Sequence, residues 1–190
     1  MLCHYEYSKR VTAQQTQAVE AAIELVGTEG LRALTHARVD ERAGLPRGST
    51  SNYFRSRRAL MTGVVEGIVE REMPSVGSAF SPSSAEELVA ALCGLFEHLT
   101  SVNRTVTTAR LVLFMEASHD TDLREALSRG RAAMESVAIL AFARLGAGDP
   151  RAAGIAVAAC FEGLLLHNIA RRDPTDPRPT FELIVRAALD

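Results

Sequence analysis

Two short helices joined by a glycine-containing turn are the feature that most constrains the fold of this 190-residue chain. Thr35 is placed to cap a first helix that ends at about Ala43, and Gly44 follows at once. Pro46 suits the first turn of the next helix, because its missing N–H would have no partner there. Two helices with almost no linker predict a helix-turn-helix. The second helix ends at Phe54 and cannot bury much of itself, so we expect its exposed face to serve a function.

The side chains of this second helix have the chemistry of a DNA-contacting surface. Short hydrogen-bonding groups suit base edges and phosphates, and an arginine can reach guanine or a phosphate. The expected contacts in the major groove are Arg47, Gly48, Ser49, Thr50, Ser51, Asn52 and Tyr53. Thr35, at a helix N-terminus, is expected to hold a phosphate. The charged residues of the first helix are expected to face water or phosphate: Arg38, Asp40, Glu41 and Arg42. The alternative is a polar surface turn without a partner.

Residues 12 to 65 resemble the DNA-binding domain of the tetracycline-repressor (TetR) family of bacterial transcription regulators. The matching positions are Gly30-Leu31, Leu34-Thr35, Val39, Glu41 to Ser49, Tyr53-Phe54, Ser56-Arg57 and Leu60. The resemblance implies that Arg57, just after the second helix, contacts a phosphate. It also implies a small-molecule effector that binds elsewhere in the chain.

The sequence departs from the family pattern on and beside the second helix. Members often have Ala where this chain has Asp40, and Thr-Leu-Tyr where it has Ser49-Thr50-Ser51. Tyr53 stands where members frequently have His. The framework is retained, but the preferred DNA sequence does not carry over from the family.

Apolar periodicity over the whole chain predicts an all-α fold of about nine helices. The expected helices are Thr12–Val26, Thr35–Ala43, Pro46–Phe54, Ser56–Glu72, Ala85–Leu99, Thr105–Ser118, Asp122–Leu145, Pro150–Arg172 and Thr180–Leu189. Residues 1 to 11 are expected to be a loose arm. Gly27 and Gly30 are expected to end the first helix, and Pro74 the fourth. The run from Leu111 to Met115 is apolar nearly all round, which predicts a central, buried helix.

These elements suggest two domains. Residues 1–58 form the predicted helix-turn-helix DNA-binding domain, and residues 59–190 the predicted helical ligand-binding and dimerisation domain. A long helix would join them, followed by a linker from Pro74 to Ser84. Residues 1–58 hold nine Lys and Arg against six Asp and Glu, whereas the remainder holds twelve against seventeen. This modest contrast favours contact between the first part and a polyanion.

The cysteines and apolar segments indicate a cytoplasmic protein without membrane contact. Cys3, Cys93 and Cys160 are isolated, which fits a reducing compartment and predicts no disulfide or zinc site. The first residues have no signal-peptide core, and no run approaches the roughly 18 apolar residues that a membrane span needs.

The last two predicted helices, at about 150–172 and 180–189, are the candidate homodimer surface. An amphipathic helix beside an Ala-rich one can form a four-helix bundle with a second copy. The alternative is that both helices close the core of the monomer.

Polar groups that interrupt the apolar helices of the second part are candidates for a small-molecule pocket. The predicted ligand-binding residues are Phe96, His98, Phe114, Met115, Glu116, Met134, Phe161, Glu162 and His167. Each polar member could equally be a satisfied core or surface side chain, and the pocket itself is implied by the family resemblance.

The sequence therefore predicts a ligand-responsive DNA-binding regulator that acts as a homodimer on a palindromic operator, most often as a repressor released by a small molecule. No catalytic set, cofactor motif or metal-binding pattern is present. The alternative is a small all-α enzyme or small-molecule carrier whose first helices only pack.

Overall fold

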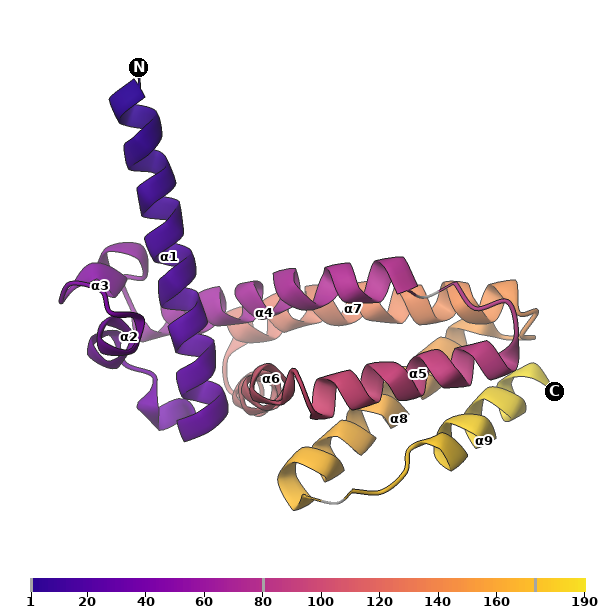
Figure 1. Ribbon diagram of the computed structural model, residues 1–190. Coiled ribbons are helices and arrows are strands. Elements are labelled where there is room, and N and C mark those ends of the chain that lie inside the picture. Colours follow the sequence, from indigo (N-terminus) through magenta and orange to yellow (C-terminus); the bar gives the residue numbers. More distant parts are fainter. Residues whose placement is uncertain (1, 80, 173) are drawn as a thin grey trace. The chain divides into compact units, whose positions relative to one another are not determined.

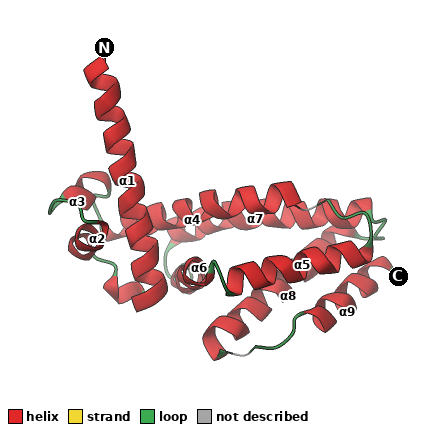
Figure 2. Ribbon diagram, in the orientation of Figure 1, coloured by secondary structure: helices red, strands yellow, loops and turns green. Residues whose placement is uncertain are grey.

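The computed structural model describes residues 2–79, 81–172 and 174–190, with side chains for 13–72, 81–172 and 174–190. This part of the chain contains nine α-helices, one short 3-10 helix and no strand (Figure 2). The predicted all-α fold is confirmed. The chain packs as two compact units, Met1–Glu70 with Thr105–Leu127 and Arg71–Arg104 with Ser128–Asp190. This packing division differs from the predicted functional boundary after residue 58, which stays a prediction.

The first unit contains the predicted helix-turn-helix and the helices that support it (Figure 1). Its elements are α1 (Leu2–Glu29), η1 (Leu31–Ala33), α2 (His36–Ala43), α3 (Ser49–Tyr53), most of α4 (Arg57–Ala79), α6 (Arg104–Glu116) and the start of α7 (Thr121–Arg144). The helices α1, α2 and α3 contact one another. Fully buried side chains from several of these elements form one core, including Ile23, Leu34, Val39, Leu60, Val64 and Leu113.

The first helix is longer than its sequence pattern predicts. The α1 helix begins at Leu2, so the prediction of a loose arm is wrong. It also continues through Gly27 to Glu29 and ends at Gly30, whose φ is 81°. Gly27 is needed for a different reason, because the backbone of Thr105 in α6 lies too close to leave room for a side chain. A close approach between segments 78 residues apart cannot be inferred from local pattern.

The α6 helix is not the fully buried helix that its apolar run predicts. Phe114 is 44% exposed and Met115 is 63% exposed, whereas Ala109 and Leu113 are buried in the core of the first unit. A helix that is apolar all round can pack with only part of its surface against one core. Phe114 and Met115 therefore face outward, whereas Val106 and Val112 pack against the core.

The α4 helix passes through Pro74 and ends at Ala79, so the predicted stop at Glu72 and the linker over residues 74–79 are wrong. A proline within a helix removes one intrahelical hydrogen bond and crowds the carbonyl four residues before it, a cost that a long helix can absorb without ending. The rest of the expected linker includes Phe80, which lies outside the described residues.

The second unit is a bundle of α5 (Ala85–Thr100), most of α7, α8 (Pro150–Arg171) and α9 (Arg178–Leu189). The α9 helix packs against α5 and α8. Their shared core includes Leu88, Phe142, Leu165, Phe181 and Val185. Gly154 of α8 lies against the backbone of Ile139 in α7, so these two helices approach each other closely. Small residues in α8 make that approach possible, as its composition predicts.

The α8 helix is long and apolar enough, by length and composition, to cross a membrane, so the prediction that no segment approaches this length is wrong. Only 22% of its most apolar 18-residue stretch is buried within the described chain. Ile155 and Leu166 are among its exposed residues, and Leu183 is exposed on α9. The helical bundle therefore leaves apolar surface uncovered on its last two helices.

Candidate nucleic-acid interface

The turn between α2 and α3 begins and ends with glycines in backbone conformations that other residues rarely adopt. The side chain of Thr35 caps α2 by accepting a hydrogen bond from the Arg38 N–H at 3.3 Å. Gly44 ends α2 with a φ of 64°, a left-handed conformation that glycine adopts at little cost. Gly48, with a φ of 89°, then precedes α3. The α3 helix begins at Ser49 rather than at Pro46, so Pro46 and Arg47 belong to the turn.

Aromatic and polar side chains fasten the carboxyl end of α3 to its neighbours. Phe54 is buried and packs on Gly63 of α4, where any larger residue would collide with its ring. The His36 ring nitrogen Nε2 lies 2.6 Å from the Phe54 carbonyl oxygen. Tyr53 donates its hydroxyl hydrogen bond to Gln14 of α1 at 3.0 Å. The carboxyl end of this short helix is thus held by contacts with α1, α2 and α4.

The amino end of α3 is held by Asp40, a residue that the sequence analysis places in water or against phosphate. Asp40 is instead 3% exposed. Its carboxylate accepts hydrogen bonds from the Gly48 N–H at 2.7 Å and the Thr50 N–H at 2.8 Å. The Thr50 hydroxyl donates a further bond at 2.5 Å. Burial raises the pKa of Asp40, but these hydrogen bonds outweigh burial, and the pKa lies below its ordinary value.

Thr50 therefore differs from the other residues expected to contact DNA. Its side chain is fully buried, and its hydroxyl is engaged by Asp40. By contrast, Arg47, Ser51 and Asn52 are exposed, and Gly48 and Ser49 are half-buried. The Ser51 hydroxyl donates to the Gly48 carbonyl at 2.8 Å. The structure thus brings Arg47, Ser51 and Asn52 together on one exposed turn and helix, and directs Thr50 into the protein.

Charged residues of α2 form ion pairs with α1. Arg38 pairs with Glu29, and Arg42 bridges Glu24 at 2.8 Å and Glu29 at 2.6 Å. The hydrogen bond from Arg38 is the largest influence that lowers the pKa of Glu29. All these side chains keep substantial solvent exposure. An exposed ion pair contributes little to stability, so Arg38 can exchange its partner for a phosphate at small cost.

Arg57, expected to contact a phosphate, is exposed but already has protein partners. Its guanidinium donates to the carbonyl of Leu31 at 2.8 Å and to that of Leu34 at 3.4 Å. It therefore braces the connection between η1 and α2 from the first turn of α4. A guanidinium has five N–H donors, so this brace leaves donors for an anion.

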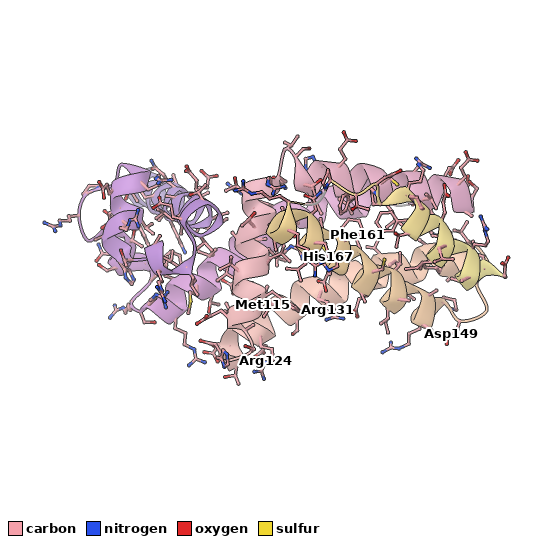
Figure 3. All side chains as sticks on the ribbon, turned by 90° about the horizontal axis from the view of Figure 1, so that it is seen from below. Met115, Arg124, Arg131, Asp149, Phe161 and His167 are labelled. Carbon is pink, nitrogen blue, oxygen red and sulfur yellow. The ribbon has the colours of Figure 1, made fainter. Side chains whose placement is uncertain are left out.

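The predicted ligand-binding residues are divided between the two units. Phe96 and Phe161 lie edge to face, with ring centroids 6.1 Å apart, in the core of the second unit. Phe181, which sequence reasoning missed, stacks on Phe161 at 5.6 Å. Met134 and Glu162 are half-buried, and His98 and His167 are exposed. Figure 3 labels Phe161 and His167 on α8. The remaining predicted residues, Phe114, Met115 and Glu116, belong to the first unit.

Two arginines of the second unit, Arg131 and Arg104, are not among the predicted site residues. Arg131 donates to Glu135 at 2.7 Å, which raises the pKa of Arg131, and it is further attracted by the predicted ligand residue Glu162. Arg104 donates to Asn168 at 3.1 Å. Arg104 has no local sequence signal because the fold brings Asn168 close, whereas the spacing of four residues between Arg131 and Glu135 could have indicated their ion pair.

Comparison with known proteins identifies related sequences and folds. Residues 18–64 match the family model of bacterial regulatory proteins of the tetR family, and residues 83–190 match the tetracyclin repressor-like C-terminal domain. The chain is 25% identical over 167 residues to the HTH-type transcriptional regulator BetI of Escherichia coli K12, a match that covers 86% of each chain.

Two solved structures are similar over nearly the whole chain. One is SCO1917, a TetR family member from Streptomyces coelicolor A3, with a TM-score of 0.76 and 21% identity over 92% of this chain and 98% of that one. The other is the multidrug binding protein EbrR complexed with ethidium, with a TM-score of 0.75 and 22% identity over 91% and 96%. These likenesses confirm the predicted fold.

Proposed function

The chain belongs to the tetR family of bacterial regulatory proteins, and from this premise we propose that it is a homodimeric repressor that binds a palindromic operator and is released by a small molecule. The observation that carries the proposal is the exposed polar surface of Arg47, Ser51 and Asn52 on a short helix whose two ends are anchored by buried contacts. A surface fixed in this way can meet base edges without ordering itself first.

In this proposal some residues around α3 contact bases and others contact phosphates. Arg47, Ser49, Ser51 and Asn52 contact base edges in the major groove. Thr35, Arg38 and Arg57 contact phosphates, which set the position of the protein but carry no sequence information. Gly48 allows the backbone to approach the duplex, and Tyr53 and Thr50 hold the helix in place.

The proposed dimer forms through α8 and α9. The exposed apolar side chains Ile155, Leu166 and Leu183 and the low burial of α8 support this assignment. A second copy packed on these helices would complete a four-helix arrangement. Two copies also supply two recognition helices, which lets the dimer bind half-sites about one duplex turn apart.

The proposed effector binds in residues 59–190, where Phe96, Phe161 and Phe181 provide apolar surface and His98, Glu162 and His167 supply polar groups. The multidrug binding protein EbrR, of similar fold, has been solved with ethidium and with proflavin. These dyes are therefore the first probes to test on this chain. A DNA-binding protein of this kind acts in the cytoplasm.

An ion-pair cluster within the first unit suggests how the binding of an effector could change the position of the DNA-binding surface. The guanidinium of Arg58, the residue after Arg57, lies 2.7 Å from the Asp122 carboxylate and 3.3 Å from the Asp120 carboxylate. These contacts join the start of α4 to the start of α7. Because Leu123 of α7 is also buried in the same core as Leu60 of α4, a shift of α7 would move the first turn of α4, which begins shortly after α3 ends.

The test is a gel shift with the DNA upstream of the chain's own gene at two salt concentrations, with and without each dye. The proposal predicts a discrete complex that weakens as salt rises, because bound phosphates displace counterions. A protein that shifts neither this DNA nor any nearby promoter would favour an all-α carrier or enzyme instead.

A further inference from the structure

Asp40 is a buried carboxylate whose described hydrogen-bond partners all lie in the turn and first residues of α3. It is 3% exposed, and its two oxygens accept from the Gly48 N–H, the Thr50 N–H and the Thr50 hydroxyl. A buried charge is costly unless hydrogen bonds compensate it. Because three donors converge on one carboxylate, the contact is stable only when α3 has its present orientation on α2.

The α3 helix needs this support more than an ordinary helix does. It has five residues, far fewer than the about 12–15 that an isolated helix needs to be even marginally stable. Its N-cap is Gly48, which makes no side-chain cap hydrogen bond. The first N–H groups of a helix require acceptors, which an N-cap side chain usually supplies. Asp40 supplies them from the preceding helix.

Asp40 also determines what Thr50 can do. The Thr50 hydroxyl is fully buried and donates to the Asp40 carboxylate. Because this hydroxyl is buried and its one proton is donated to Asp40, Thr50 cannot donate to a base edge, whereas the exposed Ser51 hydroxyl can turn from the Gly48 carbonyl toward one. The exposed hydrogen-bonding side chains around α3 are then Arg47, Ser51 and Asn52, with Ser49 half-exposed.

The negative charge of Asp40 disfavours DNA binding, whereas its hydrogen bonds to α3 favour it. A carboxylate beside a DNA-contacting helix repels phosphates, so charge alone would favour a neutral residue at this position. Geometry and charge therefore predict opposite effects of neutralising Asp40 on operator binding.

We propose that Asp40 positions the recognition helix α3 and, by binding Thr50, restricts base recognition to Arg47, Ser49, Ser51 and Asn52. The proposal rests on the DNA-binding function proposed above. Asp40 acts through α3 and is not itself a DNA contact.

The test compares Asp40→Asn with Glu41→Gln in the full-length protein. Glu41 is the exposed neighbour on the same helix, so the two variants make the same change in charge. Fluorescence anisotropy measures binding to the selected operator and to an unrelated duplex, and circular dichroism gives the folded fraction. Asparagine keeps the shape of Asp40 but cannot accept from all three donors without placing its NH2 group against one of them.

We expect Asp40→Asn to weaken operator binding by about 10-fold or more, a loss comparable to one base contact, and to leave binding to the unrelated duplex unchanged or slightly stronger. Glu41→Gln should strengthen binding to both duplexes slightly. If Asp40→Asn increases the affinity for both duplexes, as Glu41→Gln does, Asp40 acts only through its charge and the proposal fails. If Asp40→Asn instead loses binding to both duplexes in proportion to its unfolded fraction, Asp40 has only a structural role. That result also overturns the proposal.

A second pair of variants keeps the test decisive if Asp40→Asn does not fold. Thr50→Val removes the hydroxyl and keeps the shape, whereas Thr50→Ser keeps the hydroxyl. The proposal predicts that Thr50→Val binds the operator and all of its single-base-pair variants more weakly, by the same factor. Thr50→Ser should bind them as the wild type does. A Thr50→Val protein that changes its preference at a single base pair would identify Thr50 as a direct contact and refute the proposal.

The wild type distinguishes this inference from the proposed function. If the wild type binds no duplex selectively, both fail together. If it binds its operator and Asp40→Asn binds equally well, the DNA-binding function stands and the role of Asp40 is refuted.

Discussion

Replacing Gly27 by Ala should destabilise the protein, although Ala is the better helix former. Gly27 lies within α1, and a Cβ added there would sit 2.2 Å from the Thr105 carbonyl oxygen and 2.7 Å from the Thr105 Cγ2 atom. The first of these atoms belongs to the backbone of α6, so no rotamer change can relieve the contact. Either α1 or α6 must move.

The expected size follows from two opposing terms. Overpacking a well-packed contact costs about 1–3 kcal/mol, and a clash with backbone belongs at the upper end. Exchange of Gly for Ala inside a helix returns about 0.5–1 kcal/mol. Gly27→Ala should therefore lower the free energy of unfolding by about 2 kcal/mol.

Gly94→Ala is the matched control. Gly94 lies within α5, and a Cβ there would meet no atom within 4 Å. The helix-propensity term then acts alone, and stability should rise by about 0.5–1 kcal/mol. Urea unfolding followed by circular dichroism measures both changes. If Gly27→Ala stabilises the protein as much as Gly94→Ala does, α1 and α6 are not packed as described.

Four further predictions concern the DNA surface and the dimer. Arg47→Ala and Asn52→Ala should each weaken operator binding by about 1–3 kcal/mol without a change in circular dichroism, and variants that bind as the wild type does would refute the assigned surface. Arg57→Ala should weaken binding to all duplexes alike and reduce the salt slope by about one unit, whereas a sequence-selective loss would contradict a phosphate contact. The lowered pKa of Asp40 adds stability above the unfolded value of about 4 that disappears as the pH falls through the folded pKa. The stability difference between wild type and Asp40→Asn, measured by urea unfolding, should therefore be larger at pH 7 than at pH 3, and a constant difference would exclude that linkage. Leu183→Glu should convert the dimer to a monomer in analytical ultracentrifugation, and a dimer of unchanged affinity would place the interface elsewhere.

Features that depend on a few neighbouring residues could be predicted from the sequence. Thr35 is predicted from sequence to cap a helix, and its side chain accepts a hydrogen bond from the Arg38 N–H three residues later. Gly44 has the expected left-handed conformation. The family resemblance, which rests on many positions at fixed spacing, predicted the fold and the family.

Features that depend on contacts between distant segments could not be predicted. The sequence predicts that Asp40 faces water or phosphate because aspartate is usually exposed, and the partners that bury it follow only after a turn. The apolar run of α6 predicted burial, but periodicity does not specify how many neighbours a helix has, and Met115 is exposed. The local pattern predicts that Gly27 ends the first helix, although the residue that requires a glycine there, Thr105, lies in another helix. In each case the deciding atom belongs to a segment that local pattern does not include.

Selection from a random duplex library tests the central claim most directly. The purified protein is mixed with the library, bound duplexes are recovered over several rounds, and the enriched sequences are read. The proposed dimer predicts one two-fold symmetric motif with half-sites about one duplex turn apart, and Asn52→Ala should relax the preference at symmetry-related positions in both halves. A library that remains random after selection, or a motif that Asn52→Ala leaves unchanged, would contradict the assignment of α3 as the recognition helix.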